Sequence, residues 1–147
     1  MKFAPLSLSL LLLTGSCASF GGGAHRATLL STERATVQAD LASSKRSWSI
    51  GRIMATSTDP SDARLLNLTI VAFADHDGDN EVDADERRGG WNADSSVGSR
   101  QLGVSGNLAL SSLPPGDLEC LKVQTRVRYV ADPARDDEEV SVVPFRE

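Results

Sequence analysis

Hydrophobic and polar residues alternate with a period of two along most of the chain, which is the spacing of side chains on the two faces of a β-strand. Strands are predicted at 36–41, 47–50, 64–74, 101–104, 107–113, 118–130 and 140–145. Ser105-Gly106 predicts a hairpin turn between the fourth and fifth of these segments. Residues 28–42 can be helix or strand, because their alanine, leucine, glutamate, glutamine and arginine content also suits a helix.

The segment 118–130 has the clearest alternation. Its buried face is expected to carry Leu121, Val123, Thr125, Val127 and Tyr129. Its other face carries Lys122, Gln124, Arg126 and Arg128, which are interpreted as a solvated face rather than an anion site. In the segment 64–74, one face is expected to carry Leu66, Leu68 and Ile70, and the other Asn67, Thr69, Val71 and Phe73.

About seven short strands separated by turn signals, with no convincing amphipathic helix, predict an all-β fold. The expected architecture is a single β-sandwich of prealbumin-like or immunoglobulin-like kind over residues 28–147, a length that suits one domain with one core. Trp48 and Trp91 are interpreted as core residues rather than a sugar-stacking surface. Cys120 is interpreted as a small buried core residue rather than a reactive thiol.

The N-terminal residues combine one lysine with an apolar run and small residues, which is typical of a bacterial signal peptide. This leader is expected to span residues 1–16, and Cys17 follows it at the position that is acylated in bacterial lipoproteins. The competing interpretation is ordinary cleavage after Ala18. Residues 17–27 contain three glycines and predict a flexible tether. The chain is therefore expected to be exported and anchored to a membrane of the cell envelope through a lipid, or to be periplasmic or secreted if cleavage is ordinary.

Charge and cysteine content narrow the expected partners. The formal net charge of -5 disfavours nucleic acid, because such binding relies on clustered lysine and arginine. Besides Cys17 the chain contains only Cys120, so an acylated protein can form no internal disulfide. Stability has to come from another source.

The acidic segment Asp75–Glu86 places carboxylates at positions 1, 3, 5, 9 and 12 of twelve residues. This is the spacing of an EF-hand-type calcium loop. The expected ligands are the side chains of Asp75, Asp77 and Asp79, the backbone carbonyl of Glu81, Asp83 directly or through water, and a bidentate Glu86. Ca²⁺ takes six to eight oxygen ligands, whereas Mg²⁺ demands a tighter octahedron, so the segment predicts Ca²⁺.

Position 6 of such a loop is normally glycine, because the chain turns there with positive φ. This chain has Asn80, and asparagine is the commonest non-glycine residue in that conformation. Val82 is expected to anchor the loop from beneath, and His76 to point away from the ion. The alternative interpretation is a solvated acidic loop without a metal, although five carboxylates at close range repel one another when no cation is present.

The flanks of the acidic loop distinguish two kinds of calcium protein. A helix-loop-helix protein needs a helix on both sides, but β-branched residues precede Asp75 and Gly89-Gly90 follow Glu86 closely. Only one such loop is present, whereas calcium sensors work in pairs of hands. A single EF-hand-like helix-loop-helix protein is the alternative to the sandwich.

The strand Leu68–Ala74, the acidic loop and the later turn Leu113–Leu118 together resemble the B-repeat sandwiches of serine-aspartate-repeat adhesins. They are similar in the same way to collagen-adhesin B-type and carboxypeptidase-regulatory-like domains. The resemblance covers residues 64–130. It implies a β-sandwich fold and a structural calcium ion, but it implies no adhesin partner.

No combination of residues indicates an enzyme. His25 lies in the expected tether and His76 in the acidic loop, so neither is placed as a general base. Carboxylates held ionised by Ca²⁺ make poor general acids. A small periplasmic hydrolase would need an acid or histidine outside the loop. The expected function is therefore that of a non-catalytic structural or binding module, whose protein or glycan partner the sequence does not identify.

Overall fold

The computed structural model of the chain describes residues 22–146, except 45–46, 60–63, 104–105, 112 and 134. The expected signal peptide 1–16 and the lipidation site Cys17 lie outside the described residues, so both stay predictions. Within the described residues, no helix is long and apolar enough to span a bilayer.

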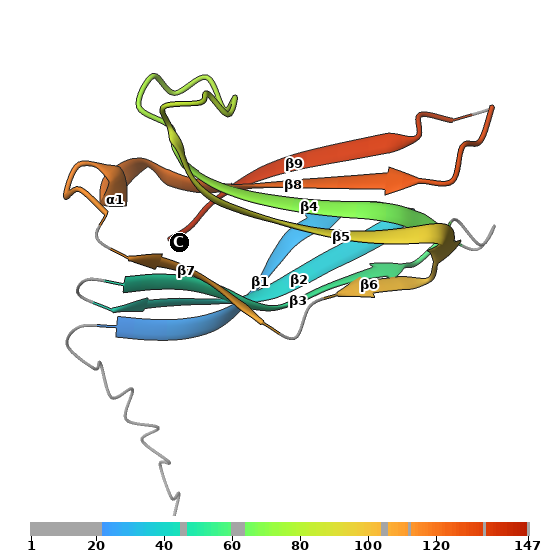
Figure 1. The fold of residues 1–147 in the computed structure, drawn as a ribbon, viewed down its shortest axis with the longest axis horizontal. Coiled ribbons are helices and arrows are strands. Elements are labelled where there is room, and N and C mark those ends of the chain that lie inside the picture. Colours follow the sequence, from blue (N-terminus) through green and yellow to red (C-terminus); the bar gives the residue numbers. More distant parts are fainter. Residues whose placement is uncertain are drawn as a thin grey trace, which may run out of the picture.

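The described residues form two antiparallel β-sheets that lie face to face (Figure 1). The elements are β1 (Gly22–Ser31), β2 (Ala35–Ser44), β3 (Ser47–Ser57), β4 (Leu65–Ala74), β5 (Arg87–Ser99), β6 (Gln101–Gly103), β7 (Asn107–Ser111), α1 (Asp117–Cys120), β8 (Leu121–Tyr129) and β9 (Glu138–Pro144). One sheet has the order β1-β2-β3-β6, with β7 also paired to β3, and the other has the order β5-β4-β8-β9. The prediction of an all-β sandwich is confirmed.

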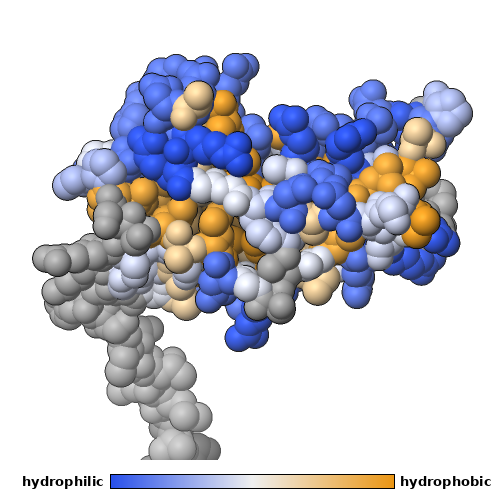
Figure 2. Space-filling view, viewed as in Figure 1, coloured by the Kyte–Doolittle hydropathy of each residue, from blue (hydrophilic) through white to orange (hydrophobic). Residues whose placement is uncertain are grey.

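Apolar side chains from both sheets fill the space between the layers. On the face that Figure 2 shows, hydrophobic residues are visible between the layers, and hydrophilic residues cover much of the rest of that face. Trp48 is 1% exposed and meets Phe145 edge to face, with ring centroids 4.8 Å apart. Trp91 is partly buried and packs against the same core. Both tryptophans are therefore core residues, as the sequence predicts.

Strand β8 confirms the face prediction in the segment 118–130. Its five expected core residues are buried, and the residues between them are half-buried or exposed. The strand begins at Leu121 rather than Leu118, because Asp117–Cys120 form the one-turn helix α1. Because β8 pairs with β4 on one side and β9 on the other, it runs through the middle of its sheet.

Strand β4 departs from the predicted faces at its beginning. Its register shifts between Leu65 and Asn67, so that Leu65 and Leu68 are both buried while Leu66 is only half-buried. A bulge of this kind inserts one residue and moves the following side chains to the other face. The prediction that Leu66 shares a face with Leu68 is therefore wrong.

Residues 28–42 are strand, not helix. They contain the end of β1 and most of β2, which are joined by a turn in which the backbone N–H of Thr32 donates to the carbonyl of Ala35 at 2.9 Å. Strand β1 also includes Gly22–Ala27, which were expected to belong to the tether. This segment pairs with β2 up to Ser44, and the ladder gives its glycines and small residues backbone partners that a free tether lacks. The sandwich therefore begins before residue 28.

Two further strands differ from the sequence prediction. Strands β6 and β7 both pair antiparallel with β3, so they run along the same neighbour in the same direction and do not form a hairpin with each other. The hairpin predicted at Ser105-Gly106 is therefore wrong. Strand β5 was not predicted, because its sequence is polar and glycine-containing, and it forms by pairing with β4 at the edge of the sheet.

Candidate metal centre

The acidic loop connects β4 to β5 at one end of the sandwich (Figure 1). Its two ends are held together, since the N–H of Ala74 donates to the carbonyl of Glu86 at 2.9 Å. The N–H of Asp75 donates to the carbonyl of Cys120 at 3.0 Å, which ties the loop to α1 as well. The first and last of the predicted ligands are therefore brought together by strand pairing, with no helix on either side.

The structure brings three of the six predicted ligands together. Asp75, Asp77 and Glu86 each offer a carboxylate oxygen, and these oxygens lie within 4.8 Å of one another. Asp75 and Glu86 are buried, whereas Asp77 is exposed. All three are hard oxygen donors, which is the donor type that Ca²⁺ and Mg²⁺ prefer.

The other three predicted ligands lie outside this group of carboxylates. The side chains of Asp79, Glu81 and Asp83 are exposed. A carboxylate oxygen of Asp79 accepts the N–H of Glu81 at 2.7 Å, and the carbonyl of Asp83 accepts the N–H of Glu86 at 3.2 Å. These residues shape the loop through its backbone, and their predicted role as ligands stays a prediction.

The carboxylate of Asp75 organises the first half of the loop. Its Oδ1 accepts the N–H of Gly78 at 2.8 Å, and its Oδ2 accepts the N–H of Asn80 at 3.3 Å. Both of these residues have positive φ, at 78° for Gly78 and 63° for Asn80. The expected left-handed turn at Asn80 is therefore confirmed, and asparagine tolerates it better than most side chains.

Glu86 has an unusual environment for an ionisable group. The residue is only 5% exposed, and its Oε1 accepts the N–H of His76 at 2.8 Å. Its Oε2 is buried and has no hydrogen-bond partner among the described residues. A buried carboxylate oxygen without a partner is costly, since it has lost its water and gained nothing in exchange. A cation shared with Asp75 and Asp77 would satisfy this atom, so the residues present fit a bound metal ion.

Lys122 lies against the same loop. Its Nζ is 2.5 Å from Oδ2 of Asp75 and 2.7 Å from Oδ1 of Asn80. The pKa of Asp75 is lowered, chiefly by the hydrogen bond from Lys122. Burial raises this pKa, and the hydrogen bonds from the backbone N–H groups of Gly78 and Asn80 lower it further. The interpretation of Lys122 as part of a solvated face is therefore wrong.

A second polar cluster lies beside the loop and was not predicted from the sequence. Asp117 is 2% exposed and accepts hydrogen bonds from Arg88, with Nε at 2.6 Å from Oδ2. Nε2 of His76 lies 2.9 Å from Oδ1 of the same carboxylate, and Nδ1 of His76 lies 3.4 Å from Sγ of Cys120. The ring of His76 thus turns toward α1, and its expected orientation away from an ion stays a prediction.

This cluster has the residue types of a cysteine–histidine–aspartate arrangement, but its electrostatics oppose nucleophilic chemistry. Burial, and then the negative charge of Asp117, raise the pKa of the Cys120 thiol. A cysteine nucleophile instead needs a lowered pKa. Arg88 holds the pKa of Asp117 below its ordinary value, so this pair is an internal ion pair that fixes His76. Cys120 is half-buried in this polar cluster, and its predicted place in the apolar core is wrong.

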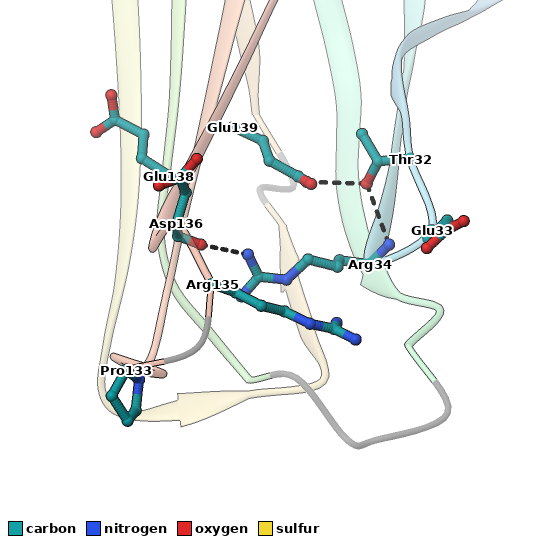
Figure 3. A pocket seen from close by; sticks show the side chains of 8 residues that line it. All are labelled: Thr32, Glu33, Arg34, Pro133, Arg135, Asp136, Glu138 and Glu139. Atoms are coloured by element: carbon teal, nitrogen blue, oxygen red, sulfur yellow. Dashed lines mark hydrogen bonds between the residues drawn. The ribbon is translucent and has the colours of Figure 1, made fainter.

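A pocket of about 800 Å³ lies at the opposite end of β8 (Figure 3). Its lining residues are Thr32, Glu33, Arg34, Pro133, Arg135, Asp136, Glu138 and Glu139. Figure 3 shows Arg34 reaching across to the backbone of Asp136, while the hydroxyl of Thr32 donates to Glu139 at 2.8 Å. Acids outnumber arginines in the lining, and two of the lining side chains pair with residues outside the pocket: Arg135 with Asp59 at 2.9 Å and Glu138 with Arg126 at 3.6 Å.

Comparison with known proteins adds no relative to this description. No family model, curated protein or solved structure matches the chain.

Proposed function

We propose that this chain is an exported, non-catalytic β-sandwich that binds one Ca²⁺ at its acidic loop and serves as a structural or binding module of the cell envelope. The observation that carries the proposal is the buried Oε2 of Glu86, which has no hydrogen-bond partner in the described part of the chain and belongs to the carboxylate group with Asp75 and Asp77. A divalent cation supplies the missing interaction and also removes the repulsion among these carboxylates.

The donor set favours Ca²⁺ over softer metals. The group consists of carboxylates alone, and three carboxylates offer up to six oxygens to a cation that takes six to eight. The strands on both sides of the loop disfavour the alternative helix-loop-helix protein, because β4 ends at Ala74 and β5 begins at Arg87. Opening two flanking helices, as calcium sensors do, is therefore not available to this loop.

The proposed role of the ion is stabilisation of a fold that is already formed. An ion that binds only the folded state adds RT ln(1 + [Ca²⁺]/Kd) to the free energy of unfolding. Extracellular modules bind Ca²⁺ with Kd near 10⁻⁴–10⁻³ M, so 1 mM Ca²⁺ is expected to add about 0.4–1.4 kcal/mol. For a domain of this size that corresponds to an increase of roughly 2–5 °C in Tm.

Calorimetric melts in EDTA and in millimolar Ca²⁺, together with a calorimetric titration, test the proposal. Glu86→Gln should abolish the difference in Tm, because it removes the charge of the buried ligand. Asp85→Ala is the matched control, since Asp85 is exposed and lies outside the carboxylate group, and it should keep the difference. Mg²⁺ should substitute poorly. A wild-type Tm that is the same in EDTA and in Ca²⁺, together with no heat of binding in the titration, would contradict the proposal.

The membrane anchor is proposed from Cys17, which follows the apolar leader directly after Gly15 and Ser16. Metabolic labelling with a palmitate analogue should mark the wild-type protein and miss Cys17→Ser. If neither protein is labelled and the mature N-terminus is Ser19, ordinary cleavage after Ala18 replaces this part of the proposal.

A further inference from the structure

Lys122 presents a positive charge to the carboxylate that opens the acidic loop. Strand pairing sets Lys122 opposite Phe73, two residues before Asp75, so the position of the lysine is determined by the sheet rather than by the loop. The side chain of Asp75 is fully buried, and that of Lys122 is 25% exposed. The ammonium group therefore meets a carboxylate that water does not reach.

We infer that Lys122 is a built-in competitor of the metal ion: it holds the ion-free loop closed and lowers the affinity of the loop for Ca²⁺. The inference rests on the proposed function and deepens it by naming what regulates the site. The geometry behind it is the pair of contacts from Nζ, at 2.5 Å to Asp75 and 2.7 Å to Asn80, which bridge the first and sixth positions of the loop.

The first consequence concerns the protein without Ca²⁺. Asp75, Asp77 and Glu86 lie close enough to repel one another, and the positive charge of Lys122 contacts this group through Asp75. Removing its charge leaves Asp75 buried without its ion-pair partner, which is a costly state for a carboxylate. The ion-free protein should therefore lose stability when Lys122 is neutralised.

The second consequence concerns binding. A divalent ion at Asp75 would lie a few ångströms from the ammonium group of Lys122, which contacts the same carboxylate. The two positive charges would repel each other. Even with a water-like dielectric constant and screening by salt, the Coulomb energy at that range corresponds to a change in affinity on the order of tenfold, and the burial of Asp75 can only enlarge it. Because the ion-free state also becomes less stable without Lys122, both effects tighten the binding of Ca²⁺ to the variant.

The two consequences have opposite signs, which separates this role from a merely structural one. A residue that only supports the fold would lower both stability and affinity when it is replaced. A competitor lowers the stability of the ion-free protein and raises the affinity for Ca²⁺. Lys122→Gln should therefore melt earlier than the wild type in EDTA and regain most of the loss in saturating Ca²⁺.

The matched control is Arg126→Gln. Arg126 lies on the same face of β8 four residues further along, where it pairs with Glu138 at 3.6 Å. Its replacement removes the same formal charge at a distance from the loop, so Ca²⁺ affinity should change by less than about twofold because salt screens distant charges. Lys122→Arg keeps the charge beside Asp75 and should not show the tenfold gain.

Calorimetric titration of the full chain with CaCl₂ and melting in EDTA provide both measurements. Tighter binding by Lys122→Gln than by a wild type that itself binds supports both the inference and the proposed function. Equal or weaker binding by the variant overturns the inference and leaves the proposed function standing. Binding by the variant alone supports the inference and overturns the proposed function, because Lys122 then occupies the place of the ion. Absence of binding in both proteins overturns both.

Discussion

Tyr129 links the two sheets at the end of the sandwich that lies away from the acidic loop. The side chain is 1% exposed, and its hydroxyl donates to Oε2 of Glu139. The hydroxyl of Thr32 donates to the same oxygen at 2.8 Å, and the guanidinium of Arg34 lies 3.8 Å from the centre of the tyrosine ring. Tyr129→Phe keeps the ring for Arg34 and removes one donor from the carboxylate.

The expected loss follows from this environment. A hydrogen bond to a charged group contributes about 1.5–3 kcal/mol, and Glu139 keeps its hydrogen bond from Thr32, so Tyr129→Phe should lower the free energy of unfolding by about 2 kcal/mol. Burial, and then the hydrogen bond and charge of Glu139, raise the pKa of Tyr129 well above its ordinary value. The wild-type protein should therefore resist forming tyrosinate while it is folded.

The raised pKa determines the pH dependence. Folding favours neutral Tyr129, so this contribution to stability is fully present below the ordinary pKa of about 10 and is lost as pH rises toward the folded pKa. Between about pH 9 and pH 11 the wild type should lose about 1.4 kcal/mol that Tyr129→Phe does not lose. The advantage of the wild type should shrink accordingly, because the other titrating groups are common to both proteins.

Urea denaturation at several pH values measures the difference, and tyrosinate absorbance reports the ionisation directly because the chain contains one tyrosine. Thr32→Val is the control: it removes the other donor to Glu139 and should lower stability, but it should keep the alkaline loss. Equal stability of wild type and Tyr129→Phe at neutral pH, or tyrosinate in the folded protein near pH 10, would refute the reasoning.

Three further predictions concern the packing of the sandwich. Val123 is fully buried, so Val123→Ala should lower the free energy of unfolding by about 1–3 kcal/mol. Gln124 is half-buried, and Gln124→Ala should change it by no more than about 0.5 kcal/mol in the same denaturation assay. Equal losses would show that the faces of β8 are misassigned. Gly98 has φ 81° and an added Cβ would meet Arg64 at 2.7 Å, so Gly98→Ala should lower Tm, while Gly116→Ala, with open space around it, should not. Thr125 is fully buried, and its hydroxyl has no partner among the residues that the structure describes. Thr125→Val should therefore leave stability unchanged or raise it by about 1 kcal/mol, and a loss would mean that the hydroxyl is satisfied.

Local sequence determined the features that depend on a residue and its near neighbours. The alternation in β8 predicts which side chains are buried, because a strand places successive side chains on opposite faces whatever its partners are. The spacing of Asp75, Asp77 and Glu86 in one short loop predicts that their carboxylates converge, and Asn80 takes the left-handed conformation that its side chain tolerates.

Strand pairing decided the features that depend on distant residues. Strands β6 and β7 both pair with β3, and the polar strand β5 pairs with β4. These ladders are made by backbone groups, which are the same in nearly every residue, so the pattern of side chains does not reveal which strands pair. The bulge at Leu66 likewise changes the faces of β4 without a signal in the alternation.

The surroundings of the candidate metal centre show the same division. Lys122 reaches Asp75 across 47 positions of the chain, and Arg88 reaches Asp117 across 29. In the sequence, Lys122 is one of several basic residues on a polar face, and only the pairing of β8 with the end of β4 directs it to the loop. The sequence of the loop thus determines its carboxylates, whereas the tertiary structure brings Lys122 to Asp75. Charge interactions depend on distance in space and not on separation along the chain.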